Sequence, residues 1–274
     1  MNADSVFQIG HDHIICEDYA VAGHLDNKLT YAIVCDGCSA SPDVDFGARA
    51  LALSARQTLQ YKLHLEAGLF ENVNPELNAT RFGDITVQRA ATVLTTFNLL
   101  SPRALDATLL VAWVQDGMAT IYMYGDGVFV HRMENGTHKV HIHLSSGAPD
   151  YLAYHLDKGR KKSYDALVDN QKVIDVQCAS GTGMTAPILK PLEPYSVIVP
   201  VKPGEVLSVI SDGIGSFRKS NNDSIDWATL VDEFTGYKNF EGQFVQRRIN
   251  AFKRKCVKEA WQHLDDISIA SIVV

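Results

Sequence analysis

The chain has 274 residues, of which 46% are hydrophobic and 21% are charged, and its formal net charge is −7 at neutral pH. This composition is typical of a globular protein, and the acidic balance argues against a nucleic-acid or anionic-membrane partner. No apolar run reaches the roughly 18 residues of a membrane span, and the first residues lack the pattern of a signal peptide. We therefore expect a cytoplasmic protein with one domain over residues 1–274.

The chain contains five cysteines at irregular spacing. Cys35 and Cys38 form a C-x-x-C pair, which is the spacing of a redox motif or of half a zinc site, but no second pair matches it. Reduced thiols in a cytoplasmic protein are therefore the favoured interpretation.

The N-terminal part predicts strands followed by helices. A first strand is predicted at residues 6–9 and a β-hairpin at 19–24 and 28–35. A helix is predicted to begin with Ser41 as its N-cap and Pro42 at its first position, and its apolar residues recur every three or four positions to residue 63. A second helix is predicted over residues 85–100.

The rest of the chain is rich in predicted strands. Four of them are separated by Asp-Gly and Asn-Gly turns, which are typical of tight hairpins and predict an antiparallel meander; they cover 107–115, 118–125, 128–133 and 137–144. Strands at 195–199, 205–211 and 267–274 and helices at 224–234 and 243–261 follow. This order predicts an α+β fold of two mainly antiparallel sheets stacked face to face, with helices outside.

Residues 145–194 lack a long periodic run and are interpreted as an inserted flap of short strands or loops. The basic cluster at 157–162 within this range is either a solvated turn or a contact for an acidic substrate segment.

Acidic residues mark the ends of four predicted strands. They are Asp36-Gly37, Asp126-Gly127, Asp212-Gly213 and Asp265-Asp266. Each Asp-Gly pair alone is a common turn signal, but strand ends deliver side chains to the rim of a sheet, where sites are usually built. Carboxylate and backbone carbonyl oxygens are the ligands that Mg²⁺, Mn²⁺ and Ca²⁺ prefer. The four pairs together predict a divalent metal site.

The ordered motifs resemble those of the metal-dependent type 2C (PPM) serine/threonine protein phosphatases, especially bacterial-type members. The resemblance spans nearly the whole chain and rests on Glu17-Asp18, Val34-Cys35-Asp36-Gly37, Phe46-Gly47-Ala48, Asp106-Ala107-Thr108, Gly125-Asp126-Gly127, Ser211-Asp212-Gly213 and Asp265-Asp266-Ile267-Ser268. It implies a four-layer α-β-β-α sandwich with a two-metal site at one end. One departure is Asp106, which stands where the family usually has glycine.

The resemblance also implies roles for the acids. Asp36 bridges two divalent cations, Mn²⁺ or Mg²⁺, and the Gly37 carbonyl binds one of them. Asp212 and Asp265 bind the other cation. Further acids hold metal-bound waters or contribute to a third, weaker metal site; these are Glu17, Asp18, Asp126 and Asp266.

Two positions are left open by the motifs. Alignment with the family motif prefers Asp265 over Asp266 as the ligand, and since successive strand residues point in opposite directions, the two are not expected to face one metal together. His13 stands where animal members have an arginine that holds the substrate phosphate, so His13 is either a phosphate contact or a plain loop residue.

These features predict hydrolysis of phosphoserine and phosphothreonine esters in proteins by a metal-bridged water or hydroxide, with Asp36, Asp212 and Asp265 acting through that water. The expected partner is a phosphoprotein, such as a Ser/Thr kinase or its target. Two alternatives remain: a catalytically silent regulatory or binding module on the same fold, and a metal-dependent hydrolase of small phosphoesters.

Overall fold

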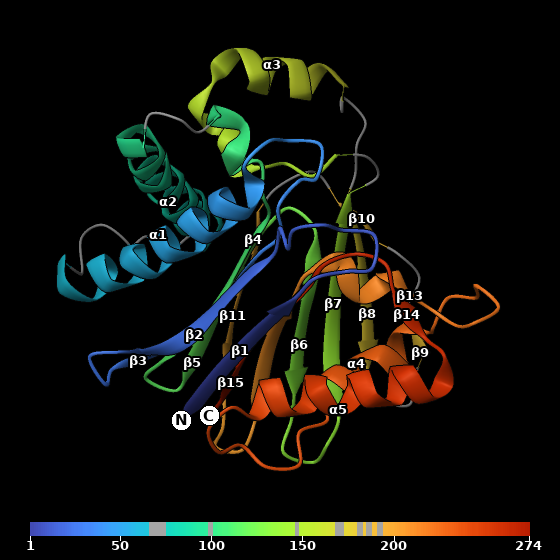
Figure 1. The fold of residues 1–274 in the computed structure, drawn as a ribbon. Helices are drawn as coiled ribbons and strands as arrows, with labels where there is room; N and C mark the ends of the chain where they lie inside the picture. The colour runs from blue at the N-terminus through green and yellow to red at the C-terminus, as the bar shows by residue number, and fades with distance from the viewer. Residues whose placement is uncertain are drawn as a thin grey trace.

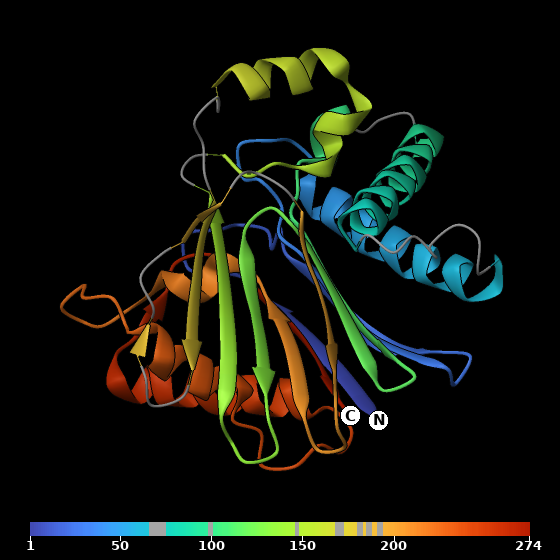
Figure 2. The ribbon, with the colours of Figure 1, turned by 180° about the vertical axis from the view of Figure 1, so that it is seen from behind.

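The computed structural model describes residues 1–65, 75–97, 101–145, 148–167, 173–179, 183–184, 188–190 and 194–274. Two large antiparallel sheets pack face to face, and helices lie against their outer faces (Figures 1 and 2). The predicted four-layer α-β-β-α sandwich is therefore confirmed.

The smaller sheet has five strands in the order β11-β5-β4-β3-β2. Its strands are β2 (Tyr19–Leu25), β3 (Leu29–Cys35), β4 (Leu109–Gln115), β5 (Met118–Tyr124) and β11 (Tyr195–Pro200). Helices α1 (Val44–Leu65) and α2 (Pro75–Phe97) cover its outer face, where Leu51, Phe82 and Trp113 belong to one buried apolar cluster.

The larger sheet has eight strands, in the order β1-β15-β12-β6-β7-β8-β10 with β9 paired to β8. They are β1 (Asn2–Gln8), β6 (Gly127–Arg132), β7 (His138–Ser145), β8 (Val173–Ala179), β9 (Gly183–Met184), β10 (Ile188–Lys190), β12 (Val206–Ile210) and β15 (Ile267–Val273). Helices α4 (Trp227–Thr235) and α5 (Phe244–Glu259) pack on it through aromatic residues that include Phe234 and Phe252. A short pair, β13 (Phe217–Arg218) and β14 (Gln262–His263), lies apart from both sheets.

A third apolar cluster fills the space between the two sheets and contains Leu110, Met123, Leu207 and Ile272. Central strands such as β3 and β15 are therefore buried on both faces. This double burial explains why their sequences are nearly continuous apolar runs instead of alternating patterns.

The predicted meander is wrong at one connection. The hairpins β4-β5 and β6-β7 form as expected, but β5 belongs to the smaller sheet and β6 to the larger one. The segment Gly125-Asp126-Gly127 thus carries the chain between sheets. A side chain at residue 127 would place its Cβ 2.4 Å from Leu110 Cδ2, so the crossing requires glycine there.

The first two helices begin at other residues than predicted. Ser41 is not the N-cap of α1, because its hydroxyl donates to Asp106 instead. The helix begins at Val44, directly after Asp43, which has a positive φ of 58°. Helix α2 begins at Pro75, well before residue 85. Ala79 and Phe82, both fully buried, extend its apolar face toward the N-terminus.

The range 145–194 contains the short 3₁₀ helix η2 (Leu152–Leu156) and helix α3 (Lys158–Leu167), and α3 was not predicted. Its strand β8 pairs with β7 and so belongs to the larger sheet. The basic cluster at 157–162 lies at the start of α3 and is not a turn. Residues 146–147, 168–172, 180–182, 185–187 and 191–193 lie outside the described residues, and the function of the range as a flap stays a prediction.

Candidate metal centre

The acid-bearing strand ends meet at one end of the sandwich. Tyr19, the first residue of β2, pairs with Cys35, the last residue of β3. Asp18 precedes the one and Asp36 follows the other, so these two acids lie across from one another. In the other sheet β12 and β15 are antiparallel neighbours. The 3₁₀ helix η3 (Asp212–Ser216) after β12 therefore lies beside the residues that precede β15.

Asp36 is at the centre of these acids. Burial raises the pKa of its carboxyl well above the usual range, and the nearby charges of Asp18 and Asp212 raise it further, followed by that of Asp265. Several carboxylates that repel one another in a partly buried place are favourable for folding only when a cation compensates their charge. The arrangement therefore fits the predicted divalent cations.

Asp18 lacks a hydrogen-bond partner for either carboxylate oxygen among the described residues, although the residue is only 2% exposed. Burial raises its pKa to about 7, and the nearby hydroxyls of Ser268 and Ser211, which do not meet hydrogen-bond geometry with it, oppose this shift only in part. An unsatisfied buried carboxylate in a native fold indicates a missing ion or ordered water. Asp18 is thus well placed to hold waters around a cation.

Gly37 forms an isolated bridge with Ala107 in the smaller sheet. The bonds of this bridge are donated by Cys38 N to Asp106 O and by Thr108 N to Asp36 O, both at 2.8 Å, so they do not use the Gly37 carbonyl. A Cβ at residue 37 would lie 2.9 Å from Glu17 O and 3.0 Å from Val44 Cβ. The close packing explains the glycine and leaves its carbonyl available as a ligand.

Asp265 and Asp266 directly precede β15 and differ in exposure, and both carboxylates contact the ring of His13. The Asp265 side chain is 49% exposed, whereas that of Asp266 is 2% exposed. Asp266 accepts hydrogen bonds from the backbone N–H groups of Gly10 and Glu17, at 2.7 and 2.5 Å. Burial raises the pKa of Asp265, and the charge of Asp212 adds to this, which places Asp265 beside Asp212.

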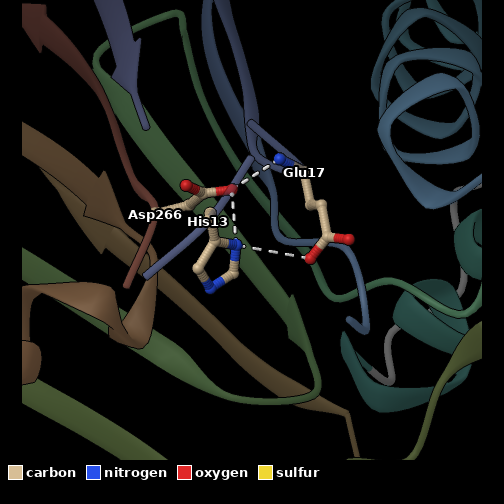
Figure 3. Close-up of side chains that lie close together, drawn as sticks. All are labelled: His13, Glu17 and Asp266. Carbon is tan, nitrogen blue, oxygen red and sulfur yellow. Dashed lines mark hydrogen bonds and ion pairs between the residues drawn. The ribbon is translucent and has the colours of Figure 1, made fainter. Parts of the chain in front are cut away.

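His13 lies among three carboxylates, and Figure 3 shows two of them, those of Glu17 and Asp266. Its Nδ1 is 3.3 Å from Asp266 and 3.5 Å from Glu17, and its Nε2 is 3.1 Å from Asp265. Ligand atoms of His13, Glu17 and Asp266 all lie within 4.8 Å of one another. Sequence reasoning named these residues separately but did not group them, since they are brought together only by the pairing of β1 with β15.

Asp126 is buried and its Oδ1 accepts hydrogen bonds from the backbone N and the hydroxyl of Ser145, at 2.8 and 2.6 Å. Burial raises its pKa to about 6, and the charge of Asp212 contributes to this shift. Asp126 and Asp212 therefore border a common space.

The sequence analysis did not identify Ser145 as a site residue, and it named Ser211 and Ser268 only as parts of motifs.

Comparison with known proteins decides the family. The family model described as Protein phosphatase 2C matches residues 10–152, which is more than half of the chain. The chain belongs to the protein phosphatase 2C family. Members of this family are metal-dependent phosphatases that use Mn²⁺ or Mg²⁺. No curated protein matches the sequence.

Solved structures share the fold of this protein phosphatase 2C member at low sequence identity. The phosphatase domain of SpoIIE from Bacillus subtilis, with a fragment of its regulatory domain, is 12% identical with a TM-score of 0.53, over 100% of this chain and 63% of that chain. A serine/threonine phosphatase from S. agalactiae is 15% identical with a TM-score of 0.52, over 99% and 98% of the two chains. RsbX in complex with magnesium is 14% identical with a TM-score of 0.51, over 98% and 92%. This chain thus spans less than two thirds of the SpoIIE chain.

Two further features of the chain concern membrane spans and cysteines. Among the described residues, no helix combines the length and the apolar composition that crossing a membrane requires. Cys35 is buried and Cys38 is partly exposed, and both are free thiols. Their C-x-x-C spacing therefore reflects a strand end and the residues after it, not a disulfide.

Gly213→Ala is expected to lower the free energy of unfolding by about 1–3 kcal/mol. A Cβ at residue 213 would lie 1.8 Å from the backbone oxygen of Asp266, so η3 could no longer lie beside the start of β15. Thermal unfolding in a metal chelator measures this cost. Gly159→Ala is the control, since its Cβ would approach only the Asp157 side chain, at 3.2 Å. Equal unfolding temperatures for the two variants would contradict the close contact.

Proposed function

We propose that this protein hydrolyses phosphoserine and phosphothreonine esters in proteins, using two divalent cations held by Asp36, the Gly37 carbonyl, Asp212 and Asp265. The observation that carries the proposal is the convergence of Asp18, Asp212 and Asp265 on Asp36, where their charges raise the pKa of its carboxyl. All these donors are hard oxygens, which suits Mn²⁺ and Mg²⁺.

We assign each side chain a role from its position. Asp36 comes from the smaller sheet and faces Asp212 from the larger one, so it is placed to bridge two cations. Asp126 shares a space with Asp212 and is the candidate for a third, weaker site. When bound, the cations would neutralise the phosphate ester and lower the pKa of the attacking water.

His13 is not assigned to the substrate phosphate in this proposal. Its ring is surrounded by Glu17, Asp265 and Asp266, which accounts for both of its nitrogens. We infer that it holds these carboxylates in place around the centre. The proposed substrate is a phosphoprotein, such as a Ser/Thr kinase or the target of one.

The test is hydrolysis of an aryl phosphate, a phosphothreonine peptide and a nucleoside monophosphate, each with Mn²⁺ or with chelator. Mn²⁺-dependent turnover with a strong preference for the peptide over the nucleotide supports the proposal. Equal turnover of both would favour a small-molecule phosphoesterase. A folded protein that neither turns over nor binds Mn²⁺ at millimolar concentration would instead be a binding module on this fold.

Asp265→Asn and Asp266→Asn are expected to act differently. Asp265→Asn changes a half-exposed ligand, so it weakens Mn²⁺ binding at least tenfold, and it does not lower the free energy of unfolding in chelator, since the folded state already raises the pKa of Asp265. Asp266→Asn disturbs a buried carboxylate that accepts from Gly10 and Glu17, so it lowers the free energy of unfolding by about 1–3 kcal/mol. Titration calorimetry measures Mn²⁺ affinity, and chemical denaturation measures the free energy of unfolding. If Asp266→Asn weakened Mn²⁺ binding and Asp265→Asn lowered stability, Asp266 would be the ligand and Asp265 the structural acid.

A further inference from the structure

Asp106 is a buried acid that the metal centre does not use. It follows the 3₁₀ helix η1 (Pro102–Leu105), precedes β4 and is only 2% exposed. Its backbone oxygen accepts from Cys38 N at 2.8 Å, directly after Gly37. Protein phosphatase 2C motifs usually have glycine at this position, so its carboxylate is a feature of this chain.

The Asp106 carboxylate is fully engaged by other side chains. Arg160 Nη2 lies 2.8 Å from both carboxylate oxygens, and the Ser41 hydroxyl donates to Oδ2 at 2.8 Å. Arg103 Nε is 3.5 Å from the same oxygen. Because a buried carboxylate is strongly unfavourable when one partner is removed, the Asp106–Arg160 pair is a specific attachment of α3 to the body of the protein.

Aromatic contacts join α3 to η2 around this attachment. The Arg160 guanidinium lies 5.0 Å from the centroid of the Tyr154 ring. Tyr154 in turn lies 4.7 Å from Tyr164 and 5.6 Å from Tyr151, measured between ring centroids. The Tyr164 hydroxyl donates to Ala148 O at 3.0 Å. Residues 148–167 therefore form one packed unit, here called the cap segment.

The cap segment lies beside residues of the candidate metal centre: a Cβ on Gly125, next to Asp126, would lie 3.3 Å from Pro149 Cβ, and Tyr151 packs in the same apolar cluster as Cys38. Burial raises the pKa of Tyr151, and the neighbouring Cys38 thiol and Asp36 carboxylate raise it further. Burial likewise raises the pKa of Tyr164, and the charges of Asp150 and Asp126 add to this effect. Figure 1 shows α3 at the same end of the sandwich as the turn that follows β3.

We propose that the Asp106–Arg160 ion pair positions the cap segment as one wall of the entrance to the metal centre, and thereby determines how this enzyme binds phosphoprotein substrates. The proposal rests on the proposed phosphatase function. Asp106 and Arg160 act through the position of the wall, so a small aryl phosphate does not depend on the pair, whereas a peptide that lies along the wall does.

The experiment compares Arg160→Met, Asp106→Asn and the double variant with wild type, and uses Lys162→Met on the same helix as the control. Arg160 is the main test residue, because its side chain is 27% exposed, whereas that of Asp106 is buried. Hydrogen exchange of the α3 amides reports on the attachment without any need for activity. Steady-state kinetics with the aryl phosphate and the phosphothreonine peptide report on its consequence.

We expect Arg160→Met to speed exchange of the α3 amides at least tenfold and to raise KM for the peptide at least fivefold, with kcat for the aryl phosphate within twofold of wild type. The double variant should resemble each single one. If the α3 amides of Arg160→Met exchanged at the wild-type rate, the ion pair would not attach α3. If they exchanged faster but KM for the peptide stayed unchanged, the ion pair would have no role in substrate binding. If wild type hydrolyses neither substrate, the proposed function fails, while exchange still decides the attachment.

Discussion

Asp36→Asn is expected to abolish Mn²⁺-dependent phosphoester hydrolysis, lowering kcat/KM for an aryl phosphate by roughly a thousandfold or more. Asp36 lies beside Asp18, Asp212 and Asp265, whose charges all act on its carboxyl. An amide removes the negative charge that would bridge two cations. It keeps the shape of the side chain, so the strand end and its bonds to Thr108 should persist.

Measurement of kcat/KM with and without Mn²⁺, together with calorimetric Mn²⁺ titration, checks this expectation. Asp116→Asn is the matched control, because Asp116 lies in the β4-β5 turn with a positive φ of 51°, which asparagine adopts readily. The control should retain wild-type activity and metal affinity. Hydrolysis by Asp36→Asn at the wild-type rate would rule out the proposed bridging role.

Asp18→Asn is expected to make the metal-free protein more stable at neutral and alkaline pH. Burial raises the pKa of the Asp18 carboxyl to about 7, whereas an unfolded chain has an aspartate pKa of about 3.9. The folded state therefore disfavours the charged form. Each pKa unit corresponds to about 1.4 kcal/mol, so ionised Asp18 lowers the free energy of unfolding by a few kcal/mol, and an amide removes this cost.

The sign follows from linkage between protonation and folding. Because the folded-state pKa is the higher one, wild type in chelator should lose stability as pH rises from about 4 to about 7 and level off above that. The advantage of Asp18→Asn should grow over the same range. Chemical denaturation at pH 5 and pH 8 tests this. With Mn²⁺ present, wild type should become the more stable protein, since only wild type then has the Asp18 carboxylate beside a cation. If Asp18→Asn were less stable than wild type in chelator at pH 8, that result would contradict the argument.

Local signals in the sequence were sufficient for the long central strands and for the acidic positions. Strands β3 and β15 are continuous apolar runs because both of their faces are buried, and an acid just outside such a run has to lie at the rim of its sheet. The family motif also preferred Asp265 over Asp266 as the ligand before their exposure was known, and this assignment stays a prediction. These features depend on neighbouring residues, so they can be read from the chain alone.

Tertiary structure decided which elements lie together. The hairpin turn signals did not show that the Gly125-Asp126-Gly127 segment joins two sheets, because the choice of sheet depends on strands far away in the chain. Ser41 was predicted to cap a helix but instead binds Asp106. That contact exists only because η1 and β4 return beside the end of β3.

The sequence by itself therefore determined the family of folds, the kind of metal ligand and the places where acids leave the strands. Only the tertiary structure decided that His13 lies between Glu17 and Asp266, and that Arg160 binds a buried Asp106. The physical reason is that spacing along a strand or helix follows from local geometry, whereas the partner of a buried charge is set by long-range packing, which has no local pattern.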